Sequence, residues 1–311
     1  MISKPTRDAV GEVLIELASA GNKDIVSVNC DIGKSCKTLD FAKQFPNQYV
    51  NVGIAEQNAG GVAAGLATCG KIPFISTYAV FGSMRMSEQI RQEACYPNLN
   101  VKLCCSHGGL TPANDGASHQ GIEDMGIMRT IPNMKVIMPA DYTSAKALMR
   151  EVAADYGPTY IRFTRDNVPG IYEEGTKFEI GKANKLKDGD KIAIIANGDI
   201  MKKAVDAAEV LEGMGISTAV YDFHTIKPLD VDCVKAVVES GAKIITVEDH
   251  NILNGLGSAV CEVVAEMGKG QVKRVGIQDK FGESGPYEDL LIKHQITVDY
   301  IVESAKKLLN V

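Results

Sequence analysis

The sequence predicts an α/β protein of two consecutive domains, each built on a mainly parallel sheet with helices on both faces. The chain has 311 residues, enough for two hydrophobic cores. Short β-branched runs alternate with longer helical patterns on both sides of the middle, as in parallel sheets. Residues 166–190 interrupt this alternation with glycines, a proline and charges. We therefore assign domains to residues 1–168 and 191–311, joined by a linker at 169–190.

The first domain is expected to begin with a helix that Thr6 caps and that ends before Gly21. A strand at 25–29 and a polar loop follow, and a second strand then runs into a helix at Glu56. The remaining expected elements continue the alternation: strand 72–76, helix 83–95, strand 101–106, a long loop, strand 135–138, a helix from 141 to about 154, and strand 159–164.

The second domain repeats the pattern. Its expected elements are strand 191–196, helix 201–214, strand 218–223, helix 231–240, strand 244–247, helix 256–266, strand 272–277 and two terminal helices at about 286–293 and 298–309.

Glu56 lies where an apolar strand (50–54) meets a helix of small residues (55–67). A strand that runs directly into a helix leaves unpaired N–H groups that face whatever lies beyond the turn. The apolar neighbours of Glu56 predict a poorly solvated carboxyl. Desolvation disfavours the charged form, so such a group can share a proton with a ligand. The simpler alternative is a glutamate that complements the helix dipole.

Composition argues against several classes of protein. The net charge of −6 and the lack of a basic run argue against a nucleic-acid groove. No apolar run approaches the length of a membrane span, and charges interrupt the first twenty residues, unlike a signal peptide. The eight cysteines show no CxxC pair and no metal-ligand spacing. They predict a reducing, cytoplasmic location without a zinc site or a disulfide framework.

The densest polar cluster is the segment from His107 to Gln120. It follows a strand directly and is too long to serve only as a connection. Open α/β sheets bind ligands beyond the carboxyl ends of their strands. His107 and His119 suit proton transfer near neutral pH, and Asp115 can orient an imidazole or bind a hydroxyl. The spacing fits no standard metal site. A polar surface loop with incidental histidines is the alternative.

Arg7, Ser35 and Arg165 are candidate anion anchors. They lie at a helix start, in a loop after a strand and at a strand end, respectively. Arginine binds phosphate in a bidentate manner. Each of the three can also be only a solvated charge or a cap. Arg162, in the same strand as Arg165, is a competitor.

Two further segments are less specific. Tyr78 and Phe81 follow strand 72–76 with Met84 nearby, and such aromatic residues can stack on a heterocycle or simply pack in the core. The segment NGLGSAV (254–260) is similar to a dinucleotide fingerprint. It lacks the third glycine and the later acidic residue, so a tight turn that opens a helix explains it better.

Taken in order, these segments resemble the C-terminal two-thirds of transketolases, a pyrimidine-binding domain followed by the transketolase C-terminal domain. The most specific matches are GIAEQN (53–58), HGGLTPANDGASHQ (107–120) and VEDHNILNGLGSAV (247–260). The resemblance covers nearly the whole chain. It implies a thiamine-diphosphate-binding fold of the pyrimidine type, followed by a transketolase C-terminal-like fold.

In that family the residue that matches Glu56 hydrogen-bonds the aminopyrimidine ring of thiamine diphosphate. This contact favours the imino tautomer, which deprotonates the thiazolium carbon. The resemblance implies that Tyr78, Phe81 and Met84 pack around the pyrimidine, although the family has an aromatic residue where Met84 stands. It also implies that Asp31 lies near the cofactor at a dimer contact.

The resemblance assigns substrate roles as well. His107 and Asp115 would contact the carbonyl and hydroxyl end of the donor sugar, and His119 the substrate hydroxyls. Glu56, His107 and His119 are thus the expected catalytic residues. The positions that grip the sugar phosphate in the family correspond to Arg7, Ser35 and Arg165.

Transketolases carry an earlier domain that binds diphosphate through magnesium with a GDG motif, and no GDG occurs in this sequence. The cofactor lies between domains of different chains. The resemblance therefore implies one subunit of a split transketolase, inactive without an N-terminal partner subunit. That partner would hold the Mg²⁺ or other divalent cation. A heterotetramer with self-association is the expected assembly, and sugar phosphates are the expected substrates.

The implied reaction is two-carbon ketol transfer from a ketose phosphate to an aldose phosphate. A β-subunit of a 2-oxoacid dehydrogenase and a deoxyxylulose-phosphate-synthase-like enzyme stay as alternatives. His107, twelve residues before the His119–Gln120 pair, favours transketolase. A non-enzymatic scaffold would predict loss of Glu56 or of the histidine loop, and both are present.

Overall fold

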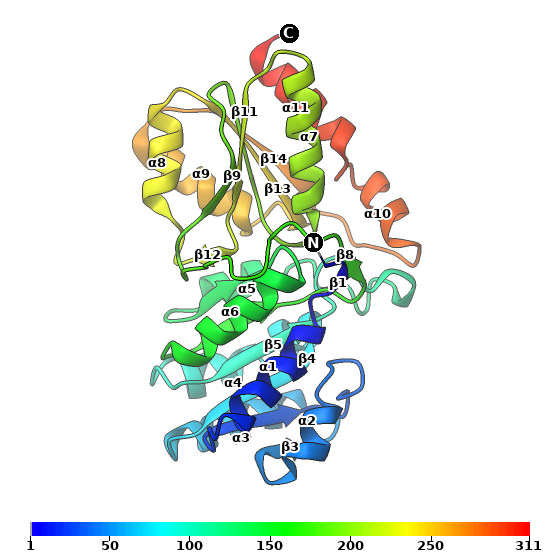
Figure 1. Cartoon of the computed structure of the whole chain (residues 1–311), viewed down its shortest axis with the longest axis vertical. Helices are drawn as coiled ribbons and strands as arrows, with labels where there is room; N and C mark the ends of the chain where they lie inside the picture. The colour runs from blue at the N-terminus through cyan, green and yellow to red at the C-terminus, as the bar shows by residue number, and fades with distance from the viewer. Residues whose placement is uncertain (1) are drawn as a thin grey trace.

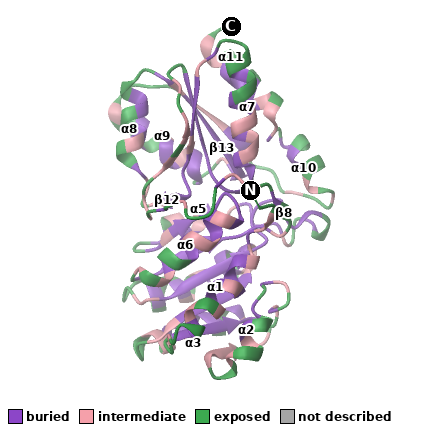
Figure 2. Cartoon of the chain, viewed as in Figure 1, coloured by how far each residue is buried: buried purple, intermediate pink, exposed green. Residues whose placement is uncertain are grey.

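Two sheets follow one another along the long axis of the molecule, each with helices on both faces (Figure 1). The structure is a computed structural model that describes residues 2–311. The sheets are buried, whereas the outward sides of the helices are exposed (Figure 2). This arrangement confirms the predicted fold class of two consecutive α/β domains. Within residues 2–311, no helix combines the length and apolar character needed to cross a membrane.

The first sheet has the strand order β12-β6-β7-β5-β4-β2-β3. Its strands are parallel except β12, which runs antiparallel to β6. Every residue of the central strands β2 and β5 is buried, as in parallel sheets covered on both faces. Their bounds are β2 Ile25–Asn29, β3 Tyr49–Asn51, β4 Ile72–Tyr78, β5 Lys102–Ser106, β6 Lys135–Ile137, β7 Thr159–Arg162 and β12 Thr225–Lys227.

Helices cover this sheet on both faces because successive side chains of a strand point to opposite sides. On β4, Phe74 belongs to the core under α1 and α6, and its neighbour Ile75 belongs to the core under α3. Asp141 caps α6 by accepting the Ser144 N–H at 2.8 Å. The helices are α1 Asp8–Ser19, α2 Leu39–Gln44, α3 Glu56–Thr68, α4 Ser87–Gln89, α5 Asp124–Thr130 and α6 Tyr142–Ala154.

The second sheet has the order β14-β13-β10-β11-β9, with only β9 antiparallel to its neighbour. Its strands are β9 Asn184–Lys187, β10 Ile192–Ala196, β11 Thr218–Asp222, β13 Lys243–Asn251 and β14 Val272–Ile277. Its helices are α7 Met201–Gly213, α8 Val231–Glu239, α9 Leu256–Met267, α10 Tyr287–Lys293 and α11 Val298–Leu309. A separate two-stranded ribbon pairs β1 Lys4–Pro5 with β8 Asn167–Val168.

Two predictions about local structure are wrong. The expected helix over 83–95 is instead a π-helix, Phe81–Arg85, then α4, then a second π-helix, Ile90–Cys95. Close packing restricts its start, because a Cβ on Gly82 would lie 2.5 Å from the Cys105 Sγ. Thr6 does not cap α1. Its hydroxyl instead accepts the Thr164 N–H at 2.8 Å, which ties the helix start to the end of β7.

The segments between the sheets are more structured than their composition indicates. Strand β9 comes from the segment expected as a linker and forms the edge of the second sheet. Strand β12, whose residues follow β11 in the chain, joins the first sheet. Tyr172, also from the expected linker, donates its hydroxyl to Asp222 Oδ2 at 2.7 Å. The chain therefore crosses between the two sheets more than once.

This buried Tyr172–Asp222 pair makes stability depend on pH. Burial raises the pKa of Asp222 to about 7, above its ordinary value of 3.8. Between these two values the folded chain binds more protons than the unfolded chain, so the contribution of Asp222 is lost as the pH rises toward 7. We expect the wild-type free energy of unfolding to fall by about 2–3 kcal/mol from pH 5 to pH 8 relative to Asp222→Asn.

Urea unfolding at several pH values measures this difference. Asparagine keeps an acceptor for the Tyr172 hydroxyl but does not titrate, so the pair of curves isolates Asp222 from the other buried carboxyls. If the free energy of unfolding changed with pH in the same way in both proteins, the raised pKa of Asp222 would be contradicted.

Candidate functional site

Polar side chains gather where the strands of the first sheet end. Tyr78 is the last residue of β4, His107 directly follows β5, and Arg165 lies three residues beyond the end of β7. Arg7 joins them at the start of α1. The carboxyl ends of parallel strands lie at one edge of a sheet, so residues distant in sequence come together here.

His107 is the central residue of this edge. It is buried, has a positive φ of 62°, and stacks on Tyr78 with ring centroids 3.9 Å apart. Its Nε2 lies 3.4 Å from Arg7 Nη1, and its Nδ1 lies 2.8 Å from Ser106 Oγ. A guanidinium can only donate, so Nε2 accepts and the ring proton lies on Nδ1. Burial, with the charges of Arg7 and Arg165, lowers the pKa of His107 to about 3. The imidazole is therefore neutral near pH 7.

Arg7 and Arg165 place two cations beside His107. Arg7 Nη1 donates to the Ser35 carbonyl at 3.1 Å, so Ser35 contributes backbone rather than its hydroxyl. The Arg7 Nε is buried and has no hydrogen-bond partner among the described residues. Burial is the main cause that lowers the pKa of Arg7, and the charge of Arg165 adds to it. Two neighbouring guanidinium groups with an unused donor are suited to bind an anion.

The long loop after β5 brings further candidate residues to the same place. We call residues 107–121 the His107 loop. Arg165 Nη1 donates to the Pro112 carbonyl at 2.7 Å and to Asp115 Oδ2 at 3.3 Å. The His119 ring lies edge-on to Phe81 and Tyr78, at 5.6 and 6.0 Å between centroids. Both histidines of the loop thus face one aromatic wall.

Glu56 lies in a separate depression of about 560 Å³ at the start of α3. Its side chain is 4% exposed, and its Oε2 lacks a hydrogen-bond partner within residues 2–311. The expectation of a poorly solvated carboxyl is thus confirmed. The charge of Glu56 adds to burial in raising the pKa of Cys30 to about 12, so that thiol is unreactive.

Arg85 is a residue of this site that sequence reasoning missed. Its Nη1 lies 3.6 Å from Glu56 Oε2, and its guanidinium lies over the Phe81 ring, 5.5 Å from the centroid. Its side chain is 58% exposed. The sequence carries one relevant signal, since an arginine four residues after Phe81 can reach the aromatic ring within a helical segment. The pairing with Glu56 depends on long-range folding.

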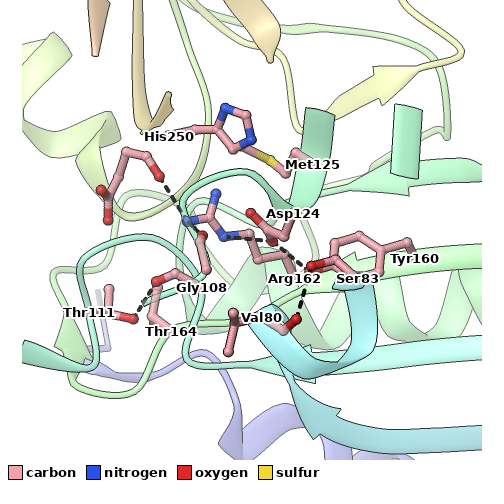
Figure 3. A network of polar contacts seen from close by, with 12 residues as sticks. Val80, Ser83, Gly108, Thr111, Asp124, Met125, Tyr160, Arg162, Thr164 and His250 are labelled. Carbon is pink, nitrogen blue, oxygen red and sulfur yellow. Dashed lines mark hydrogen bonds and ion pairs between the residues drawn. The ribbon is translucent and has the colours of Figure 1, made fainter. Parts of the chain in front are cut away.

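Met84, Asp31 and Asp115 are the expected site residues that are exposed at the surface. Met84 is 45% exposed in the same π-helix as Phe81. Asp31 is exposed with a φ of 62°, and its Oδ1 accepts from Asn51 Nδ2 at 3.0 Å. Their expected roles beside a cofactor stay predictions. Arg162, the competing anion anchor, is fully buried beneath the His107 loop and contacts Asp124 at 3.4 Å (Figure 3).

No group of three or more His, Cys, Asp or Glu side chains in residues 2–311 is arranged to hold a metal ion. The depression at Glu56 instead offers one buried carboxylate and the guanidinium of Arg85. Arg85 lies over Phe81, which in turn packs against Tyr78 with ring centroids 5.9 Å apart. This donor set suits a flat heterocycle with an N–H or a ring nitrogen at its edge.

Two family descriptions match the chain. The pyrimidine-binding domain of transketolase matches residues 3–170, and the transketolase C-terminal domain matches residues 181–301.

Individual relatives agree with these matches. A protein of Methanocaldococcus jannaschii described as a transketolase C-terminal section is 45% identical over 93% of this chain and 92% of its own length. A 6-deoxy-6-sulfo-D-fructose transketolase subunit of Clostridium sp. is 37% identical over 97% of this chain and 94% of its own length. A solved split-gene transketolase, described as an inactive β4 tetramer, is 43% identical over 98% of both chains with a TM-score of 0.90.

Proposed function

The chain belongs to the transketolase family as the C-terminal subunit of a split transketolase, and on that premise we propose that it transfers a two-carbon ketol unit from a ketose phosphate to an aldose phosphate. The observation that carries this proposal is the buried Oε2 of Glu56, which makes no hydrogen bond among the described residues. It lies 3.6 Å from Arg85 Nη1, and the Arg85 guanidinium in turn lies over the Phe81 ring. These groups form one half of a cofactor site.

The residues present fit the pyrimidine half of thiamine diphosphate. When bound, that cofactor supplies the carbanion chemistry of the reaction. Glu56 would share a proton with the aminopyrimidine ring, while Tyr78 and Phe81 would pack on its face. We expect Met84 to complete that wall and Asp31 to lie at the subunit contact. The described residues offer no donor set for a divalent cation, so we propose that an N-terminal partner subunit holds Mg²⁺ and the diphosphate.

The histidines are proposed to handle the sugar. His107 is neutral, so it can accept and donate hydrogen bonds without a charge penalty. We assign His107 and Asp115 to the carbonyl and hydroxyl end of the donor. His119, whose Nδ1 lies 2.9 Å from Ser118 Oγ, is assigned to the substrate hydroxyls.

The arginines are proposed to hold the anionic end of the sugar. Arg7 and Arg165 place positive charge beside His107, and Arg7 also donates to the Ser35 carbonyl. The Clostridium relative is named for a sulfonated sugar, and a sulfonate is also a tetrahedral anion. We infer that the substrate ends in such an anion, with phosphate expected.

The test of this chemistry is an assay of the chain combined with a diphosphate-domain partner. Transfer from xylulose phosphate to an aldose phosphate is expected. Decarboxylation of pyruvate instead would favour a 2-oxoacid dehydrogenase, and condensation of pyruvate with an aldose phosphate would favour a deoxyxylulose-phosphate synthase. Either result without ketol transfer would overturn the proposal.

Replacing Arg7 with methionine should weaken the binding of the phosphorylated donor. Loss of a charge-assisted hydrogen bond is typically worth about 1.5–3 kcal/mol, so we expect KM to rise about 10- to 100-fold. Steady-state kinetics of both proteins, with phosphorylated ketose donors of different carbon-chain length, would measure the change in KM.

Arg150→Met is the matched control, because Arg150 forms an exposed ion pair with Glu16 on the surface. Equal KM values for the Arg7 variant and the wild type would contradict the assignment of Arg7.

A further inference from the structure

The His107 loop is held by the second domain as well as by the first. The Leu110 N–H donates to both carboxylate oxygens of Asp249, at 2.9 and 3.2 Å. At the other end of the loop, Gln120 Nε2 donates to the Glu283 carbonyl at 2.9 Å. Both partners belong to the C-terminal half of the chain. The second domain therefore contacts the candidate catalytic loop near each of its ends.

The loop approaches Asp249 so closely that only glycine fits. A Cβ on Gly108 would lie 1.9 Å from Arg162 Nε, and a Cβ on Gly109 would lie 2.1 Å from Asp249 Oδ2. Gly109 also has a φ of +60°, which favours glycine. The paired glycines of the HGGL segment thus allow the backbone to rest directly on an arginine and an aspartate (Figure 3 shows Arg162 beside Gly108).

Asp249 is itself tightly fixed. It lies near the end of β13 and is fully buried. Arg162 Nη2 donates to its backbone carbonyl at 2.8 Å. The Tyr287 hydroxyl contacts its Oδ2 at 3.1 Å and also donates to Asp199. The carboxylate that receives the Leu110 N–H therefore has little freedom to move.

Backbone contacts connect this anchor to His107. The Gly109 N–H donates to the Gly121 carbonyl at 2.7 Å, and the Gly108 N–H to the Phe163 carbonyl at 3.1 Å. His107 directly precedes this clamped segment. Its ring must keep the 3.4 Å distance to Arg7 and the stacking on Tyr78. A displacement at Leu110 would move the imidazole away from both.

We propose that Asp249 is a positioning residue: through the Leu110 N–H it fixes the His107 loop, so the second domain sets the placement of the candidate catalytic imidazole. The kinetic part of this inference rests on the proposed function. The structural part, the restraint of the loop by Asp249, does not.

Hydrogen–deuterium exchange of the full chain tests the structural part. In Asp249→Ala, amides of residues 108–121 should exchange about tenfold faster, because the Leu110 N–H loses its acceptor. Asp249→Asn keeps an acceptor oxygen and should stay within about threefold of the wild type. Asp232→Ala, which removes an exposed aspartate of the same domain, is the control and should leave the loop unchanged. Unchanged exchange in a folded Asp249→Ala chain would overturn the proposal.

Should Asp249→Ala fail to fold, Tyr287→Phe removes one contact of the Asp249 carboxylate, together with the hydrogen bond of the same hydroxyl to Asp199. In this variant the amides of residues 108–121 should exchange faster than in the wild type. Equal exchange rates would overturn the proposal.

Kinetics of the complex with the partner subunit test the functional part. Asp249→Ala should lower kcat for ketol transfer about tenfold, with rescue by Asp249→Asn. The affinity for thiamine diphosphate should stay unchanged, because Glu56 lies outside the loop. Faster exchange with unchanged kcat would overturn the positioning role. A wild-type complex without any ketol transfer would instead defeat the proposed function, while the exchange result would still hold.

Discussion

Replacing Glu56 with alanine is expected to nearly abolish ketol transfer by the assembled enzyme, with a loss of about 10²–10⁴-fold in kcat. Glu56 is the buried carboxyl of the depression, and the other charged side chain that lines it is the cation Arg85. Proton sharing by a positioned side chain typically contributes about 10²–10⁴-fold. Glu56→Gln, which keeps the shape of the side chain but cannot share a proton as a carboxylic acid, should lose nearly as much. Single-turnover kinetics would measure both variants.

Glu288→Ala is the matched control for this experiment. Glu288 also lies in the first turn of a helix, α10, but it is exposed and pairs with Lys203. If Glu56 only complemented a helix dipole, both variants would lose up to about 1 kcal/mol of stability and no activity. Full activity of Glu56→Ala would therefore leave the dipole as the whole explanation for this residue.

Replacing Arg162 with methionine is expected to destabilise the chain by about 3–5 kcal/mol, the usual effect of breaking a buried ion pair from one side. Arg162 and Asp124 are both fully buried, with Arg162 Nε 3.4 Å from Asp124 Oδ2. The Tyr160 hydroxyl donates to the same oxygen at 2.5 Å. Removal of the guanidinium would leave the Asp124 carboxylate buried with only that one donor beside it. The midpoint of urea unfolding would measure the change.

Two further variants make this prediction specific. Arg150→Met removes an arginine of similar size from an exposed pair and should change stability by at most about 1 kcal/mol. Arg162→Met combined with Asp124→Asn should recover part of the loss, because no unpaired charge is left buried. An Arg162→Met protein as stable as the wild type would contradict the prediction that this buried ion pair stabilises the chain.

The strands are the part of the fold that sequence predicts best. β2 and β14 have the predicted bounds, because short segments with β-branched residues at several positions indicate strands. Pairing partners are less predictable. Strand β12 leaves the second domain to join the first sheet, and its three residues carry no local signal for that choice. The π-helical turns at Phe81–Arg85 depend on contact with Cys105, which is equally invisible to periodicity.

The candidate site was predictable in its residues but not in its connections. His107, Arg7 and Tyr78 come together because parallel strands end at one edge, and sequence can supply that rule. No such rule predicts the ion pair of Glu56 with Arg85 or the hydrogen bond from the Leu110 N–H to Asp249. Each joins segments that lie far apart in the chain, and no spacing rule relates them. Asp249 and Arg85 therefore emerge only from the folded chain.

The most direct test of the central claim, that Glu56 supplies half of a shared site, is to measure thiamine diphosphate binding and ketol transfer for the chain alone and with its diphosphate-domain partner. If the site is divided between two subunits as proposed, the chain alone should neither bind the cofactor tightly nor turn over substrate. The complex should do both. An isolated chain that binds the cofactor and transfers the ketol unit as well as the complex would contradict the account.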